Sequence, residues 1–276
     1  MGYTHPNEPN FERTRSPHYF FISALIHVYL KREGNAMNPS DDSSIHPIHR
    51  IQMFAGGSPF ITLSRIYQGV ALFDSVEILE IQADAVLLKT KNSLVLADYE
   101  SDFYLHSLDF PQPIRGRMLQ RDLSSSILTL GALTYMPEHW KERYHVRVKP
   151  SEPVFVTMKK MGHDFRACLL DLDETGLGAT TDSEVREWIA DKMDGDLSIF
   201  LQLTPNLSIK ALRGKVCYTR DINRRTVRLG IRTTPTRAQI KQLNLYIEER
   251  RAQIMANLRD AFLHELSPTP VQNLFF

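Results

Sequence analysis

The chain has 276 residues, a net charge of +1, 42% hydrophobic residues and 24% charged residues. Its length suits two domains better than one core, and its composition is that of an ordinary globular protein. The nearly neutral charge gives no support to a DNA-binding protein. Residues 141–276 hold 22 Lys and Arg against 17 Asp and Glu, whereas residues 1–140 hold 11 against 15. An anionic ligand is therefore expected in the second half.

Residues 1–45 are rich in Pro, Asn, Ser, Asp and His, and we predict a flexible N-terminal tail. The apolar stretch 19–30 has 12 residues, too few for a membrane-spanning helix of about 20, and no cleavage site follows it. We therefore expect no transmembrane segment and a cytoplasmic protein. Translation could start at Met1 or at Met37. Cys168 and Cys217 lie in apolar runs and are expected to be buried thiols in a reducing cytosol.

Residues 46–136 alternate short apolar runs with Gly, Asp, Asn and Pro, which predicts a small antiparallel β-barrel. The predicted strands begin near residues 60, 76, 85, 93 and 126. The segment containing Asp102 and His106 is interpreted as a polar turn. Nothing in this half suggests a catalytic cluster.

Residues 137–149 are predicted to be a linker that carries an arginine arm, and residues 150–276 a second barrel with a long C-terminal helix. Strands are expected at 154–158, 165–172, 197–203, 209–218 and 226–233, and a covering helix at 181–193. Thr236 and Gln239 form a capping-box pattern, and an apolar stripe continues to Ser267. We expect the helix to pack on its own barrel; a homodimer through the same stripe is the alternative. The predicted fold class is thus mainly β, with two antiparallel barrels in tandem.

The second half contains one constellation that suits an anionic purine nucleotide. The run Arg143-Tyr-His-Val-Arg147 precedes the first strand, and Asp171-Leu-Asp-Glu-Thr-Gly-Leu-Gly178 follows the second. A guanidinium fork can bind a phosphate or the O6/N7 edge of guanine, and a carboxylate can accept from the N–H groups of the other edge. Glycine lets backbone and ligand approach closely. Arg224, Arg225 and Arg228 are interpreted as a solvated hairpin.

These motifs resemble the PilZ family, whose pattern is R-x-x-x-R followed by D/N-x-S-x-x-G on a six-stranded barrel. The resemblance also includes Pro153-Val-Phe-Val, Arg213-Gly-Lys-Val-Cys-Tyr and Val227-Arg-Leu-Gly-Ile-Arg, and the first half resembles the N-terminal domain of flagellar-brake-like proteins. It implies binding of cyclic di-GMP. Arg143 and Arg147 would grip phosphate and guanine, Asp171 would contact a base, and Gly176 would shape the turn.

Asp173 stands where the family has serine, and a carboxylate there would repel a dianionic ligand. A second register, from Asp173 to Gly178, restores a hydroxyl at Thr175; both registers stay open, with the first preferred.

The resemblance implies a receptor with no enzyme activity, catalytic residue, metal or cofactor. Its ligand would order the arginine arm and re-orient the barrels toward a protein partner of the flagellar or secretion machinery, with motility or biofilm output. Two alternatives compete with it. One is a PilZ-like adaptor that binds only protein, which Asp173 favours. The other is a metal-dependent hydrolase using Asp171, Asp173 and His145, which lacks the spacing of a metal site.

Overall fold

The computed structural model describes residues 45–54, 61–97, 102–107, 109–136, 147–160, 163–185 and 197–267. From His46 onward the described residues belong to one compact unit. Residues 1–44 of the predicted tail, with Met37, and residues 137–146 of the predicted linker, with Arg143 and His145, lie outside these ranges, as does most of the helix predicted at 181–193. Among the described residues, no helix is both long enough and apolar enough to cross a bilayer.

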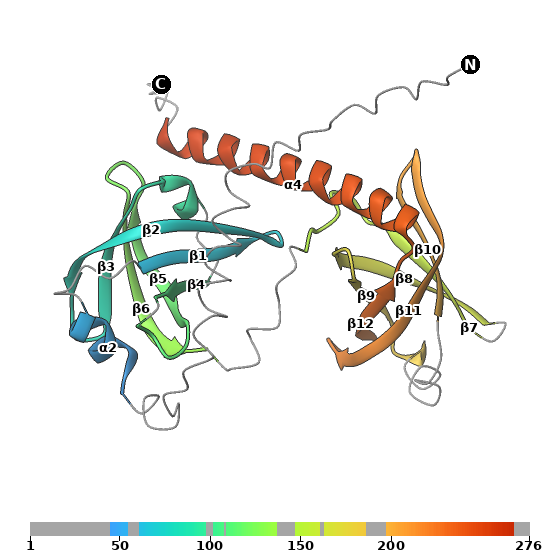
Figure 1. Cartoon of the computed structure of the whole chain (residues 1–276), viewed down its shortest axis with the longest axis horizontal. Coiled ribbons are helices and arrows are strands. Elements are labelled where there is room, and N and C mark those ends of the chain that lie inside the picture. The colour runs from blue at the N-terminus through green and yellow to red at the C-terminus, as the bar shows by residue number, and fades with distance from the viewer. Residues whose placement is uncertain are drawn as a thin grey trace, which may run out of the picture. The chain divides into compact units, whose positions relative to one another are not determined.

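Within these ranges the first half forms a closed antiparallel barrel with the strand order β1-β2-β3-β6-β5-β4 (Figure 1). Alternate side chains point inward, as in the buried Leu63, Leu88 and Leu130. The elements are α2 (Pro47–Phe54), β1 (Ile61–Tyr67), β2 (Val70–Ile81), β3 (Ala85–Thr90), the 3-10 helix η3 (Ser93–Leu96), β4 (Asp102–His106), β5 (Ile114–Asp122) and β6 (Ile127–Tyr135).

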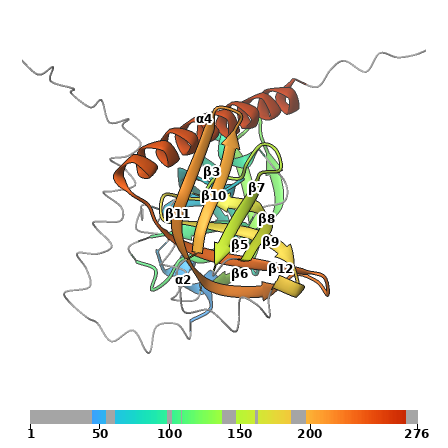
Figure 2. The same ribbon diagram turned by 90° about the vertical axis from the view of Figure 1, so that its right-hand side faces the viewer.

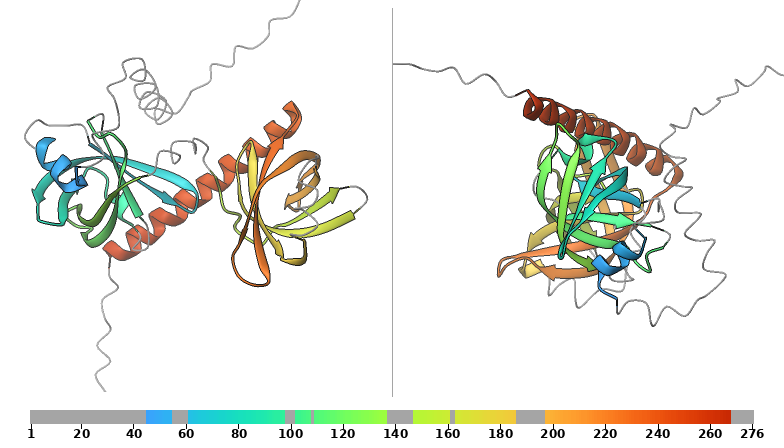
Figure 3. Two further views of the ribbon diagram at one scale, coloured as in Figure 1. Left: turned by 90° about the horizontal axis from the view of Figure 1, so that it is seen from below. Right: turned by 90° about the vertical axis from the view of Figure 1, so that its left-hand side faces the viewer.

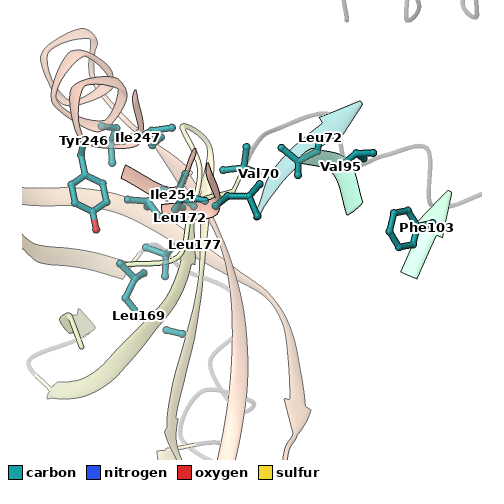
Figure 4. Packing of buried hydrophobic residues seen from close by; sticks show 14 of the residues in the cluster. Val70, Leu72, Val95, Phe103, Leu169, Leu172, Leu177, Tyr246, Ile247 and Ile254 are labelled. Atoms are coloured by element: carbon teal, nitrogen blue, oxygen red, sulfur yellow. The ribbon is translucent and has the colours of Figure 1, made fainter. Parts of the chain in front are cut away.

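The second half forms another closed antiparallel barrel, with the strand order β10-β11-β12-β9-β8-β7 (Figure 2). Its strands are β7 (Phe155–Lys160), β8 (His163–Leu172), β9 (Gly176–Asp182), β10 (Leu197–Thr204), β11 (Leu207–Asp221) and β12 (Thr226–Thr234). Leu169, Leu172 and Leu177 point into the buried cluster shown in Figure 4. The predicted fold class, two β-barrels in tandem, is confirmed.

The last element is α4 (Arg237–Leu266), seen from below in Figure 3. Its capping box between Thr236 and Gln239 is formed as predicted. Gln239 Nε2 donates to Lys210 O in β11, so the helix packs on its own barrel as expected. It also reaches the first barrel, where Glu265 forms an ion pair with Arg121 at 2.9 Å. The helix therefore contacts both halves of the unit.

Several sequence interpretations are wrong, each for a local reason. The apolar run Ser93–Leu96 is a 3-10 helix rather than a strand, and Asn92 caps it by accepting from Leu94 N. Asp102–His106 is strand β4 rather than a turn, because Phe103 and Leu105 face the core. Thr181 and Asp182 end strand β9 rather than begin a helix. Cys217 is exposed, in the bulge between Val216 and Tyr218, whereas Cys168 is half-buried.

His106 in β4 carries an expected pH dependence. Its Nε2 lies 2.7 Å from Ser64 Oγ, and burial lowers its pKa from 6.5 to about 4. Because the unfolded chain binds this proton more readily, stability should fall as pH drops from about 6.5 toward 4. We expect His106→Gln to remove a loss of about 2 kcal/mol between pH 7 and pH 5, measured by urea unfolding. The exposed His49→Gln is the control, and equal pH dependence in both variants would contradict the assignment.

Candidate functional site

The candidate site begins where the chain enters the second barrel. Val148 and Leu172 form an antiparallel bridge in which each N–H donates to the other's carbonyl at 3.0 Å. This bridge ties the segment after the arginine arm to the end of β8. Since Leu172 points inward, its neighbours Asp171 and Asp173 face outward, toward Arg147.

Arg147 lies between two carboxylates. Its Nε donates to Asp173 Oδ2 at 2.8 Å, and its Nη1 donates to Asp171 Oδ1 at 3.1 Å. The Arg147 side chain is 35% exposed, whereas that of Asp171 is 14% exposed and that of Asp173 only 3%. The guanidinium thus has an inner edge held by the protein and an outer part open to solvent. Its Nη2 donates to no protein group in the described residues.

The charge of Arg147 is fixed by these neighbours. Burial, the largest single influence, lowers its pKa, but the attraction of Asp173 and then of Asp171 outweighs it and raises the pKa above the ordinary value. The group therefore stays cationic at every physiological pH. Both carboxylates of the site are paired with this arginine. Among the described residues, no group of three or more His, Cys, Asp or Glu side chains could hold a metal ion.

Asp173 caps the turn between β8 and β9. Its Oδ1 accepts from Thr175 N at 2.7 Å and from Thr175 Oγ1 at 3.0 Å. This is the Asx-turn arrangement that favours aspartate in tight turns. The carboxylate expected to repel a ligand is thus buried, hydrogen-bonded and paired with Arg147.

Gly176 shapes the floor beside Arg147. A side chain there would start with its Cβ 2.8 Å from Ile231 O and 3.6 Å from Arg147 Nη2. Glycine therefore allows the close approach to the Ile231 carbonyl of β12, and the Arg147 guanidinium lies next to this position. Of the five predicted ligand-binding residues, the structure brings together Arg147, Asp171, Asp173 and Gly176, and Arg143 lies outside the described residues.

Arg228 is the site residue that sequence reasoning missed. It belongs to β12 rather than to a solvated hairpin, and its Nη2 donates to Asp171 Oδ2 at 2.8 Å. Asp171 thus accepts from two arginines, one through each oxygen. Arg228 and Asp171 are 57 residues apart, so no local sequence signal predicts their contact. The alternation of residues along the predicted strand does place Arg228 on the outer face.

Replacing Arg228 with glutamine should leave Asp171 with one cationic partner. We expect a loss of about 1 kcal/mol in the free energy of unfolding, because the pair is only partly shielded from solvent. Arg220→Gln makes the same charge change at the cross-strand neighbour and should cost less than about 0.5 kcal/mol. Urea unfolding compares them, and equal losses would mean that the Arg228 contact adds nothing beyond general charge.

Comparison with known proteins finds no matching family model and no matching curated protein. Among solved structures, the chain is similar to YcgR from Escherichia coli in complex with c-di-GMP, at 16% identity over 80% of this chain and 94% of that chain, with a TM-score of 0.37. The c-di-GMP-bound PilZ domain of YcgR matches at 16% identity over 43% and 98%, with a TM-score of 0.35. The Bacillus subtilis inhibitor of motility matches at 11% identity over 71% and 96%, with a TM-score of 0.36. Each match is a likeness of fold, and its ligand belongs to that protein.

The backbone that carries Arg147 is held by the β1–β2 turn and by α4. Gln68 O accepts from Lys149 N at 3.3 Å, and Gly69 packs against Arg147 O. From α4, the buried Arg250 donates through Nε to Lys149 O at 2.7 Å. The residues next to the arginine arm are thus fixed by a turn of the first barrel and by α4.

Proposed function

We propose that this chain is a receptor for cyclic di-GMP, with the ligand on the outer face of the second barrel. Arg147, Asp171, Asp173 and Gly176 would contact it or shape its site, and Arg143 would complete the arginine pair. The observation that carries the proposal is the position of Arg147: a guanidinium with an open outer part is held beside an acid-and-glycine turn. Its partly free N–H groups suit a phosphate, which accepts two parallel hydrogen bonds from one guanidinium.

The acidic side of the site suits guanine. Asp171 accepts one hydrogen bond through each oxygen, and each carboxylate oxygen can accept a second. The N–H donors on the Watson–Crick edge of guanine could use that remaining capacity, whereas adenine presents a different set of groups there. A guanine dinucleotide would thus find cationic and acceptor groups on one face, without a nucleophile or a metal.

The consequence of binding would be mechanical rather than chemical. A ligand that draws Arg143 and Arg147 together would order the arm and change the angle between the barrels. The output would be contact with a protein partner in the cytoplasm, of the flagellar or secretion machinery. A homodimer through α4 is a further proposal for how that output could be presented.

The direct test is calorimetric titration of the full chain with cyclic di-GMP. We expect micromolar or tighter binding, a raised melting temperature, and no comparable response to cyclic di-AMP. Wild-type protein that gives neither heat nor a thermal shift would overturn the proposal.

A ligand-independent adaptor is the second candidate, and the Asp173–Arg147 pair favours it. The 2.8 Å contact already uses Arg147 Nε, which a bound anion would otherwise find free. Asp173→Ser removes that contact while leaving a hydroxyl that can still cap the turn. Binding by the serine variant, together with none by wild type, would support the adaptor. Similar binding by both proteins would exclude it.

A further inference from the structure

A row of four residues crosses the outer face of the second barrel. The strand register pairs Asp171 in β8 with Gly178 in β9, Gly178 with Gly230 in β12, and Gly230 with Tyr218 in β11. Paired residues of antiparallel strands share a face, so these four lie side by side. Figure 2 shows the four strands in the wall of the barrel. The two central positions carry no side chain.

Both outer members of the row lie over the glycines. A Cβ added to Gly178 would be 2.7 Å from Asp171 Oδ1, and one added to Gly230 would be 2.0 Å from Tyr218 Cε1. The carboxylate and the phenol ring therefore occupy the space that two side chains would take. Tyr218 is still 40% exposed, so its ring is held against the sheet while part of it stays open to solvent.

Cations surround this ring and carboxylate. Arg228 and Arg232 precede and follow Gly230 by two positions on β12, which places them on the same face. Arg228 is bonded to Asp171, and the Tyr218 side chain is near enough to add to the raised pKa of Arg147. An aromatic ring, an acceptor carboxylate and guanidinium groups thus share one face of the barrel.

This combination fits a purine base. An aromatic side chain offers a π-face on which a base stacks, and loss of such stacking weakens binding by about 5- to 150-fold per base. We propose that Tyr218 is the stacking platform for one guanine of the ligand and that Asp171 accepts from the edge of that same base. The proposal rests on the proposed function and adds a residue outside the arginine and acid-and-glycine motifs.

The competing role for Tyr218 is structural, because an aromatic ring over a strand glycine stabilises the sheet by covering exposed backbone. Tyr218→Leu and Tyr218→Phe separate the two roles. Leucine keeps apolar cover over Gly230 but has no π-face, whereas phenylalanine keeps the ring and loses only the hydroxyl. A stacking role predicts that leucine weakens cyclic di-GMP binding by about tenfold or more and that phenylalanine changes it by less than about threefold.

The experiment is calorimetry on the full chain, with Phe155→Leu as control. Phe155 is an even more open ring, 61% exposed, on β7 of the same barrel, and its loss should leave affinity unchanged. Wild-type binding that Arg147→Ala abolishes but Tyr218→Leu leaves intact would overturn the stacking role and spare the receptor. No binding by wild type would overturn both.

A second variant covers the case in which Tyr218→Leu fails to fold. Tyr218→Trp keeps a π-face and adds an indole whose fluorescence should be quenched when a base stacks on it. The change is read against wild type, because the chain has two other tryptophans. An indole signal that stays unchanged at ligand concentrations shown by calorimetry to saturate the site would overturn the proposal.

Discussion

Replacing Arg147 with alanine is expected to abolish cyclic di-GMP binding, with a loss of at least about 100-fold in affinity. Truncating one partner of a hydrogen-bonded charge pair costs about 2–5 kcal/mol, and the upper part of that range exceeds 100-fold. The variant also leaves Asp173 buried and unpaired, which adds negative potential where the ligand phosphate would lie. Calorimetric titration of the full chain measures the effect.

Arg117→Ala is the matched control for this change. Arg117 and Arg121 repeat the four-residue arginine spacing on the first barrel, where Arg121 is bonded to Glu265 instead of facing a glycine turn. Its loss should leave affinity unchanged. Arg147→Lys tests geometry apart from charge, because lysine can neutralise Asp173 but has no planar fork, and we expect it to bind at least about tenfold more weakly. Retention of full affinity by Arg147→Ala would rule out this site.

Replacing Gly69 with alanine is expected to lower the free energy of unfolding by about 2 kcal/mol or more. Gly69 has φ +89°, a left-handed conformation that costs other residues about 1–2 kcal/mol. A Cβ there would lie 1.6 Å from Arg147 O, so the turn must separate from that backbone. Urea unfolding measures the loss, and Asp84→Ala in the exposed β2–β3 turn should stay within about 0.5 kcal/mol.

The same variant tests whether the β1–β2 turn positions the arginine. If the turn fixes the backbone of Arg147, Gly69→Ala should also weaken ligand binding several-fold at temperatures where the protein is fully folded. A stability loss with unchanged affinity would show that the turn supports the fold only. Asp84→Ala again provides the reference.

The strands that the sequence predicted are those with a regular inward set of apolar residues, such as β3 and β12. β5 was missed because Arg115, Arg117 and Arg121 dominate it, although Ile114 and Gly116 face inward. β9 was missed because its outward Gly176 and Gly178 read as a turn. Local chemistry alone could not reveal either strand, since pairing with neighbours decides both.

The part of the site that follows the sequence motif could be predicted from the sequence, whereas the part that depends on strand pairing could not. The resemblance to the PilZ pattern implied that Arg147 and Asp171 belong to one site, and their side chains are hydrogen-bonded. Asp173 could have been recognised as a turn cap from its position two residues before Thr175, a common Asx pattern. The Arg228 pair and the Tyr218 row depend on strand register across the barrel, which no sequence spacing encodes.

The buried carboxylate of Asp173 has a consequence for how any anion reaches Arg147. The protein already holds two carboxylates against this arginine, at 2.8 and 3.1 Å. An incoming phosphate therefore competes for its positive charge with tethered anions, whose effective concentration is high. A phosphate that binds the open Nη2 side would then share the guanidinium with two carboxylates rather than meet an unpaired cation. Added salt weakens the internal pairs and the external ones together, so affinity should respond to ionic strength less steeply than the number of arginines suggests.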